Sequence, residues 1–306
     1  MPWPSETPAL ETAPVRRSCL STPGSSRRKL AKAADVTADE LILDLEDAVA
    51  PGAKEEARGL VVDALSRPGW SRPAVAVRVN APRTPWCHLD LAALAALSEG
   101  LDSIVLPKVE GPGDLEFAAR LLDGAEAGAR SRRPLRVQAL IETAAGLARV
   151  GEIAAYGERL EALILGYADL GASLGRAGSA ASDPESWRSA QDAVLLAARA
   201  NGLQAIDGPY LGVEPDDAFF AAARHARDLG FDGKWAIHPS QVDALNELFT
   251  PSPTEIERSR ALVATLARAS EDGVGAVALD GEMLDEAVRA NALRILARAG
   301  ERQELS

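Results

Sequence analysis

The sequence predicts a TIM (β/α)8 barrel followed by a C-terminal helical extension. Eight short apolar, β-branched segments each precede an Ala-, Leu- and Glu-rich segment of helical periodicity. Most of the expected strands are apolar on both faces, which is typical of strands that helices cover outside and a core fills inside. A doubly wound open sheet is the alternative. It usually has fewer strands, and the GxGxxG turn that often follows its first strand is absent here.

The expected elements follow one another at regular intervals. The strands are 18–22, 41–45, 74–80, 103–109, 136–142, 162–168, 203–207 and 234–239. The helices between and after them are 26–34, 54–66, 88–99, 113–128, 144–157, 185–201, 214–229 and 240–248. A further helix begins at TPSPTEIERS, where Thr250 or Ser252 can cap it and Pro253 suits its first turn. A last helix is expected from about 281 to 299.

These elements predict three regions. Residues 1–14, with four prolines and no apolar segment, are expected to be a disordered arm, neither a signal peptide nor a membrane span. Residues 15–250 form the barrel, and 251–306 form the helical extension or lid. No stretch approaches the ~20 apolar residues that a spanning helix needs.

Composition restricts the partners and the compartment. The chain has 306 residues, 33 basic and 45 acidic, and a net charge of −12. So acidic a chain is a poor general binder of nucleic acid or anionic membrane, and an anionic ligand needs a local basic patch. Its two cysteines, Cys19 and Cys87, have no CxxC spacing, so we expect a reducing, cytoplasmic compartment.

Polar side chains stand at the carboxyl ends of seven consecutive expected strands, where parallel barrels place their chemistry. A random surface would not sort its charges in this way, so we expect a shared polar mouth. It explains the three acids within the apolar run LILDLEDAVAP, because charge buried without a partner is costly. The run holds Asp44, and the strand-end residues are Glu46, Asp47, Arg78, Asn80, Lys108, Glu142, Asp169, Asp207 and His238.

Clustered carboxylates repel one another unless a cation neutralises them. Oxygen ligands at a mouth open to water favour Mg²⁺ or Mn²⁺ over zinc, and the three histidines show no HxH or HExxH spacing. Glu142 and Asp169, on neighbouring units, are the preferred metal ligands. The alternative is an ion-pair network without a metal, in which two cations neutralise four acids: Arg78 and Lys108 with Glu46, Asp47, Glu142 and Asp169.

A basic stretch, RRSCLSTPGSSRRKLAKAA (16–34), contains no acid. Ser25 and Ser26 precede its expected helix, and a helix N-terminus is itself favourable for phosphate. The stretch brackets the first strand, so part of it should lie at the mouth. We expect it to bind a phosphate-rich ligand; the alternative is a solvated helix face.

Two motifs resemble parts of other catalytic sites. GASLG (171–175) matches the GxSxG of serine hydrolases, but a flexible loop rather than a helix is expected after Ser173, which disfavours a nucleophile there. The segment 171–184 is instead expected to be a mobile flap over the mouth. His238 is either a base or, as we prefer, a histidine whose hydrogen bonds are satisfied by the backbone beside a proline turn.

Taken together and in order, eight motifs resemble the citrate lyase β-subunit-like family. This is the wider group of malyl-CoA and citramalyl-CoA lyases in the HpcH/HpaI aldolase/citrate lyase superfamily. The motifs run from about residue 16 to residue 300. They are RSCLSTPGSSRRKLAKAA, LILDLEDAVAPGAKEEAR, VRVNAP, VLPKVE, LIETAAGL, LGYADLGASLG, KWAIHPSQV and ALDGEMLDEAV.

The resemblance implies a homotrimer or a dimer of trimers, and Mg²⁺ held by Glu142 and Asp169. It implies that Arg78 contacts the substrate and stabilises an enolate. Asp285, in DGEMLDEAV, looks like an acid/base supplied by a neighbouring subunit. By position alone it is only an acid in the first turn of a helix, where acids are favoured.

The expected coenzyme A contacts follow from the same resemblance. Coenzyme A would cross the basic first unit, with its phosphates near Arg17 and near Lys29 or Lys32. Three residues of the mouth are expected, from their place at the strand ends, to lie around the metal and the substrate: Glu46, Asp47 and Lys108.

The implied reaction cleaves, or forms, a 3-hydroxyacyl-CoA such as malyl-CoA or citramalyl-CoA. Its products are an acyl-CoA and a 2-oxo acid such as glyoxylate, pyruvate or oxaloacetate. Three alternatives stay open: a citryl lyase subunit acting on an acyl-carrier-protein thioester, a malyl-CoA thioesterase, and a non-catalytic subunit that only binds acyl carriers. Thr22 and Tyr167 depart from the residues common in the family, which leaves the acyl group open.

Overall fold

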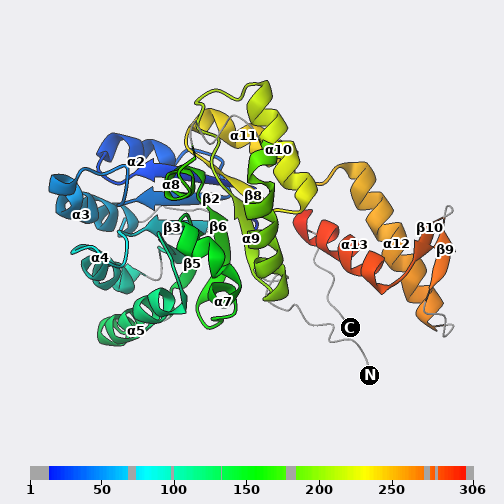
Figure 1. Cartoon of the computed structure of the whole chain (residues 1–306), viewed down its shortest axis with the longest axis horizontal. Helices are drawn as coiled ribbons and strands as arrows, with labels where there is room; N and C mark the ends of the chain where they lie inside the picture. The colour runs from blue at the N-terminus through cyan, green and yellow to red at the C-terminus, as the bar shows by residue number, and fades with distance from the viewer. Residues whose placement is uncertain are drawn as a thin grey trace. The chain divides into compact units, whose positions relative to one another are not determined.

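Eight parallel strands close into a barrel in the computed structural model, each strand paired with the next and β8 with β1. Helices surround these strands (Figure 1), so the predicted fold class is confirmed. The structure describes residues 14–67, 74–97, 100–131, 133–176, 184–271, 276–279 and 282–300. The strands are β1 (Ser18–Pro23), β2 (Glu40–Asp44), β3 (Ala74–Arg78), β4 (Ser103–Leu106), β5 (Arg136–Ile141), β6 (Leu160–Leu165), β7 (Gln204–Asp207) and β8 (Gly233–Ala236).

At least one helix follows every strand, as the alternation in the sequence predicts. The helices of the barrel are α2 (Arg27–Ala33), α3 (Lys54–Leu65), α4 (Cys87–Leu94), α5 (Pro112–Ala129), α6 (Ala144–Ala148), α7 (Val150–Ala154), α8 (Tyr167–Ser173), α9 (Arg188–Ala200), α10 (Asp217–Leu229) and α11 (Val242–Phe249). Short 3₁₀ turns are η1 (Pro51–Ala53), η2 (Ala95–Leu97), η3 (Pro184–Trp187) and η4 (Pro239–Gln241). Local signals set several helix ends: Asp216 caps α10, for example, and Gly230 ends it with a φ of 111°.

One buried apolar residue from each strand fills the middle of the barrel. Because side chains alternate along a strand, the residue two positions further on points inward as well. This rule carries three charged residues to the layer above: Asp44, Arg78 and Glu142. The apolar layer therefore forms the floor of the mouth. Its members are Cys19, Ile42, Ala76, Val105, Leu140, Ile164, Ile206 and Trp235.

A second polar layer closes the amino-terminal end of the barrel. Arg16, which is fully buried, is hydrogen-bonded to Glu40 at 2.8 Å and to Gln204. Gln138 in turn donates to Glu40 at 2.7 Å. Burial of these groups is tolerated because they pair with one another. Arg16 is therefore a structural residue of this end of the barrel, and it does not belong to the part of the basic stretch that lies at the mouth.

The chain divides into two compact units, one of residues 13–247 and one that contains the residues from 248 onward. In the second unit α12 (Pro253–Glu271) packs against α13 (Glu286–Arg298) around Val263, Ala292 and Leu296. The predicted C-terminal helices are present. The hairpin of β9 (Val277–Leu279) and β10 (Glu282–Leu284) was not predicted, and α13 begins after it rather than near 281.

The segment after β6 also differs from its prediction. α8 begins two residues after the strand, so the first part of the expected flap is helical and ends at Ser173. Residues 177–183 of that expected flap, 171–184, lie outside the described residues, as does nearly all of the expected arm 1–14. Within the described part of the chain, no helix has the length and apolar character needed to cross a membrane.

Candidate active site

Asp44 organises the loop that follows β2. Its carboxylate accepts hydrogen bonds from the backbone N–H of Glu46 at 2.8 Å and of Ala48 at 3.1 Å. The ammonium of Lys54 donates to the carbonyl oxygens of Leu45 and Glu46 at 2.9 and 2.8 Å. The loop carrying Glu46 and Asp47 is thus held from both sides. The sequence marked Asp44 only as one of three acids, although its spacing from the inward Ile42 was the signal that it points into the barrel.

Arg78, at the end of β3, is fixed by one edge of its guanidinium. Its Nε and Nη2 donate to the two oxygens of Asp44 at 2.7 and 2.6 Å. The remaining Nη1 lies 3.1 Å from Glu46 Oε2 and 3.5 Å from Asp47. Burial would lower the pKa of Arg78, but the hydrogen bonds and charges of its acidic neighbours raise it above the usual value. Arg78 is therefore a permanent cation with one edge directed at the mouth.

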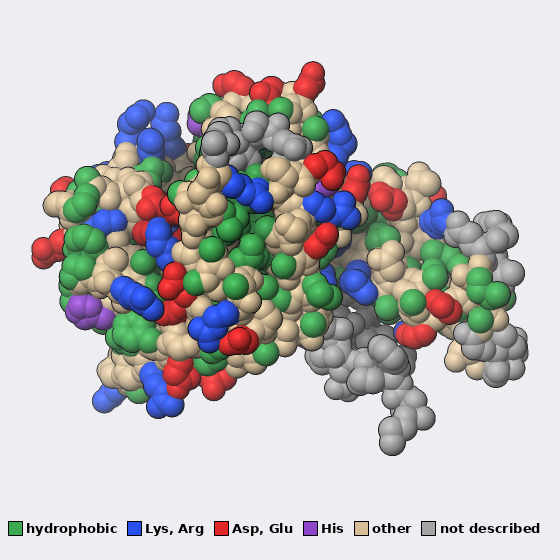
Figure 2. Space-filling model, viewed as in Figure 1, with side chains coloured by type: hydrophobic (Ala, Val, Ile, Leu, Met, Phe, Trp, Pro, Cys, Tyr) green, Lys and Arg blue, Asp and Glu red, His purple; other side chains and the backbone are tan. Residues whose placement is uncertain are grey.

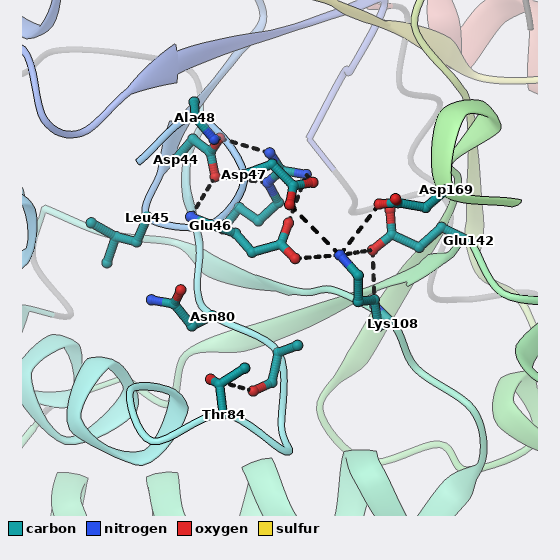
Figure 3. A network of polar contacts seen from close by, with 12 residues as sticks. Asp44, Leu45, Glu46, Asp47, Ala48, Asn80, Thr84, Lys108, Glu142 and Asp169 are labelled. Carbon is teal, nitrogen blue, oxygen red and sulfur yellow. Dashed lines mark hydrogen bonds and ion pairs between the residues drawn. The ribbon is translucent and has the colours of Figure 1, made fainter. Parts of the chain in front are cut away.

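Lys108 lies at the centre of the acidic cluster (Figure 3). Its ammonium contacts Glu46 at 2.5 Å and Asp169 at 3.3 Å. It also lies 3.8 Å from both Asp47 and Glu142. The six residues of the predicted ion-pair network, from β2, β3, β4, β5 and α8 or the residues just after these strands, are thus brought together.

Glu142 follows β5 and is the most enclosed acid of the cluster, only 3% exposed. The backbone N–H of Lys108 donates to its Oε1 at 3.0 Å. Thr143 caps α6 by accepting from Gly146 N–H at 3.0 Å, so a helix begins directly after Glu142 and this cap. Burial raises the pKa of Glu142 to about 8; Glu46 and Asp169 raise it too, against the lowering by Lys108 and Arg78. A carboxylate so placed is strongly stabilised by a cation beside it.

The mouth has room for Glu142 because residue 166 is a glycine. A Cβ at Gly166 would lie 2.6 Å from Glu142 Cβ and 2.9 Å from its Oε2. The backbone at the start of α8 therefore approaches the carboxylate more closely than any other residue would permit.

Gly166→Ala should displace the Glu142 carboxylate. We expect a loss of about 1–3 kcal/mol in the free energy of unfolding from overpacking and a weakened affinity for Mg²⁺, both measurable by denaturant titration and calorimetry. Gly124→Ala is the matched control, since a Cβ there meets nothing within 4 Å on α5 and the change should be neutral or stabilising. Unchanged metal affinity in Gly166→Ala would show that Glu142 does not depend on this contact.

The donor set suits Mg²⁺. Glu142 Oε1 and Asp169 Oδ2 approach one ammonium at 3.8 and 3.3 Å, so both carboxylates reach the same cation position. Among the described residues no group of three or more His, Cys, Asp and Glu side chains could hold an ion alone. Mg²⁺ commonly takes one or two carboxylates and completes its shell with water and substrate oxygens. Asp169, in the first turn of α8, is 40% exposed and open to such a shell.

Two other predicted strand-end residues, Asp207 and Asn80, are not part of this cluster. Asp207 is buried between Lys234, at 2.5 Å, and the hydroxyl of Tyr167, which Gln191 also contacts. Tyr167 therefore anchors α8 rather than lining the mouth. Asn80 donates to Asp90 at 2.7 Å. The expectation of seven rim groups pointing to one centre is thus wrong for Asp207, because alternation turns it away from the inward Ile206. It is also wrong for Asn80, which lies beyond the end of β3 and pairs with Asp90 of α4 instead.

His238 and Ser173 have structural partners. His238 caps η4, its Nδ1 lying 2.8 Å from Ser240 Oγ, in agreement with the preferred interpretation of a satisfied histidine. Ser173 Oγ accepts from the backbone N–H of Ala144 at 2.9 Å and ends a helix instead of beginning one. It lacks the strand–serine–helix turn of a hydrolase nucleophile.

The basic stretch separates into two parts. Arg17 precedes β1 and is bound by both oxygens of Asp39 at 2.7 Å, at the end of the barrel opposite Glu142. The predicted contact of Arg17 with coenzyme A at the mouth is therefore not supported. Lys29 and Lys32 lie exposed on α2, which follows β1, and basic side chains gather over this helix in Figure 2. They remain candidates for phosphate contacts.

Asp285 belongs to the second unit and caps α13. Its carboxylate accepts from the N–H groups of Ala287 and Val288 at 3.0 and 3.1 Å, and the side chain is exposed. Its catalytic role stays a prediction.

Comparison with known proteins places this geometry in context. The HpcH/HpaI aldolase/citrate lyase family profile matches residues 17–239. An L-malyl-CoA/beta-methylmalyl-CoA lyase of Cereibacter sphaeroides is 37% identical, over 90% of this chain and 93% of its own. A (3S)-malyl-CoA thioesterase of the same species is also 37% identical, over 92% and 94%.

Solved structures named as CitE or citrate lyase are also similar to this chain. CitE of Mycobacterium tuberculosis, in complex with magnesium, acetoacetate and coenzyme A, is 32% identical. It covers 95% of this chain and 100% of its own, with a TM-score of 0.74. A citrate lyase of Burkholderia xenovorans, 22% identical and with a TM-score of 0.82 over 94% and 92% of the two chains, shares the fold.

Proposed function

The chain belongs to the HpcH/HpaI aldolase/citrate lyase family, as the resemblance predicted, and from this premise we propose that it is a Mg²⁺-dependent carbon–carbon lyase of 3-hydroxyacyl-CoA thioesters. One observation carries the proposal: the carboxylates of Glu142 and Asp169 reach one cation position, and Glu46 links that position to Arg78. In the reaction, the bond between the α and β carbons breaks. The β-hydroxyl group gives up its proton to water at the open mouth as its carbon becomes the carbonyl of a 2-oxo acid. The α carbon leaves as an acyl-CoA enolate, which then takes up one proton.

Arg78 supplies the positive charge that stabilises the negatively charged enolate. Its Nε–Nη2 edge is held by Asp44, so the substrate contact falls to Nη1, which faces Glu46 and Asp47. A donor fixed before the reaction stabilises negative charge on the thioester oxygen without having to reorganise. Asp44 is therefore as much a part of this arrangement as Arg78.

Glu142 and Asp169 would hold Mg²⁺. When bound, the ion acts as a Lewis acid at the hydroxy-acid end of the substrate and lowers the pKa of the hydroxyl. Glu142 brings a carboxylate that its buried surroundings make dependent on a cation, and Asp169 brings an exposed one. The exposed side of Asp169 leaves space for substrate oxygens and water.

Three further parts belong to the proposal. Lys29 and Lys32, which lie on the exposed, basic face of α2, contact the phosphates of coenzyme A. Asp285 comes from a neighbouring subunit of a homotrimer or hexamer and protonates the enolate carbon. The two cysteines, both free and buried, agree with a cytoplasmic location.

Product analysis tests the proposal directly. Purified protein with Mg²⁺ should release glyoxylate and acetyl-CoA from malyl-CoA, or pyruvate and acetyl-CoA from citramalyl-CoA, and should lose this activity with EDTA. The proposal fails if neither thioester is cleaved and neither product pair condenses.

The thioesterase relative gives a second candidate function, because it resembles this chain over nearly its whole length. A (3S)-malyl-CoA thioesterase breaks the carbon–sulfur bond and releases malate and free thiol instead of glyoxylate. Measuring thiol and 2-oxo acid in the same reaction separates the two activities.

Asp285→Asn should lower turnover about 10²-fold, within the range of general acid–base catalysis, while the affinity for Mg²⁺ and for acyl-CoA is kept. The substitution retains an oxygen that can cap α13, so the fold should persist. Initial rates check the loss of turnover, and calorimetry on the same preparation checks that the affinities for Mg²⁺ and acyl-CoA are kept. Full activity in this variant would remove Asp285 from the mechanism.

A further inference from the structure

We propose that the ammonium of Lys108 is an internal cation that neutralises the acidic cluster without metal and exchanges with Mg²⁺ there. This rests on the proposed function only in taking Glu142 and Asp169 as the metal ligands. Each of the two earlier interpretations, metal site and ion-pair network, then describes one state of the same six side chains.

The contacts of Lys108 identify its ammonium as the resident cation. It is within 4 Å of four carboxylates: 2.5 Å from Glu46, 3.3 Å from Asp169, and 3.8 Å from both Asp47 and Glu142. Glu46 and Glu142 are buried, and buried like charges strongly repel unless a cation lies between them. Arg78 cannot fill this role for Asp169, since its guanidinium is fixed on Asp44 and Glu46.

The backbone of Lys108 makes the exchange feasible. Its φ of 52° is in the left-handed region, which non-glycine residues seldom adopt. In this conformation its N–H donates to Glu142 Oε1 at 3.0 Å. Glu142 is therefore held by the main chain, and it keeps its position when the ammonium moves away.

The side chain of Lys108 can move towards Glu46 and Asp47 when an ion binds. Glu46 and Asp47 lie on the loop after β2, on the side away from the β5 and α8 ligands (Figure 3). To admit an ion, the ammonium gives up only Asp169 and Glu142, and it keeps Glu46. The lysine stem is flexible, and the side chain is 33% exposed, so this movement needs no opening of the core.

Lys108 therefore stabilises the metal-free site and competes with the metal. Removing its charge should have opposite effects on the two states: the metal-free protein becomes less stable, and Mg²⁺ binds more tightly. A residue with only a structural role would not produce this combination, because loss of structure weakens binding as well.

Lys108→Met tests the exchange. At pH 8.5, we expect calorimetry to show Mg²⁺ binding at least ~10-fold tighter than in the wild type, because a nearby unit charge no longer opposes the ion. The metal-free melting temperature should fall by about 3 °C or more, and saturating Mg²⁺ should raise it more than in the wild type. Lys108→Arg, which keeps the charge, should bind Mg²⁺ no more tightly than the wild type.

Two additional variants make the test decisive. Lys108→Asn is also neutral and suits a positive φ, so it replaces Lys108→Met should that variant not fold. Arg188→Met removes a surface cation paired with Asp192 on α9 and should change neither quantity. If the wild type binds Mg²⁺ and the neutral variants bind it equally or more weakly, the exchange is refuted. If the wild type binds no Mg²⁺, the proposed metal site itself fails.

Discussion

Glu142→Gln is expected to lower turnover by ~10³-fold or more, because it removes a charged ligand from the proposed Lewis-acid site. The affinity for Mg²⁺ should fall by about 100-fold or more. The amide has the shape of the carboxyl group and can still accept from Lys108 N–H. A neutral amide is also easier to bury than the Glu142 carboxylate, because burial raises the pKa of that carboxyl group to about 8. The melting temperature without metal should therefore not fall.

Calorimetry with Mg²⁺, a lyase assay and thermal melting together check this prediction. Glu152→Gln makes the same chemical change on α7, where Glu152 pairs with Arg149 at the surface. It should leave all three measurements unchanged. Retained Mg²⁺ affinity in Glu142→Gln would exclude Glu142 as a ligand, whatever happens to turnover.

Arg78→Lys should lower kcat about 10²- to 10³-fold, the cost of losing one preorganised donor to a developing oxyanion. Lysine keeps the positive charge but cannot bind Asp44 through two parallel hydrogen bonds and still present a third nitrogen to the mouth. The affinity for Mg²⁺ should change by less than about tenfold, because the net charge of the site is the same.

Arg58→Lys is the matched control. Arg58 pairs with the fully buried Asp90 at 2.7 Å, outside the acidic cluster, so its replacement reports what an arginine-to-lysine change costs in stability alone. Steady-state kinetics and melting curves of both variants separate catalysis from folding. An Arg78→Lys enzyme that keeps more than a tenth of wild-type kcat would contradict the assigned role.

The fold was largely predictable because its signals are local and repeated. Each of the eight expected strands is present, with ends that differ by at most a few residues. One helix and one hairpin of the described residues escaped prediction. The helix α8 is short, and its sequence contains a glycine and several small side chains. The β9–β10 hairpin is stabilised by pairing between its two strands. Short elements of this kind depend on tertiary contacts more than on propensity.

The site was predictable in its chemistry but less so in its geometry. Placing acids and bases at strand ends identified Glu46, Arg78, Lys108, Glu142 and Asp169. It could not distinguish them from Asp207, whose side chain points to Lys234 and the helices. The position of a residue at the end of a strand predicts at which end of the barrel it lies. The direction of its side chain depends in addition on the register of the strands.

The amino-acid sequence alone predicts the family, the closed parallel barrel and a set of oxygen and nitrogen groups at one rim, because alternation and strand order can be read along the chain. The folded barrel is needed to see that Asp44 fixes Arg78, that Gly166 makes room for Glu142, and that Arg17 lies at the end opposite the mouth. It alone also set the ammonium of Lys108 among four carboxylates. These facts depend on distances between residues that are far apart in the chain, and such distances exist only after the barrel has closed.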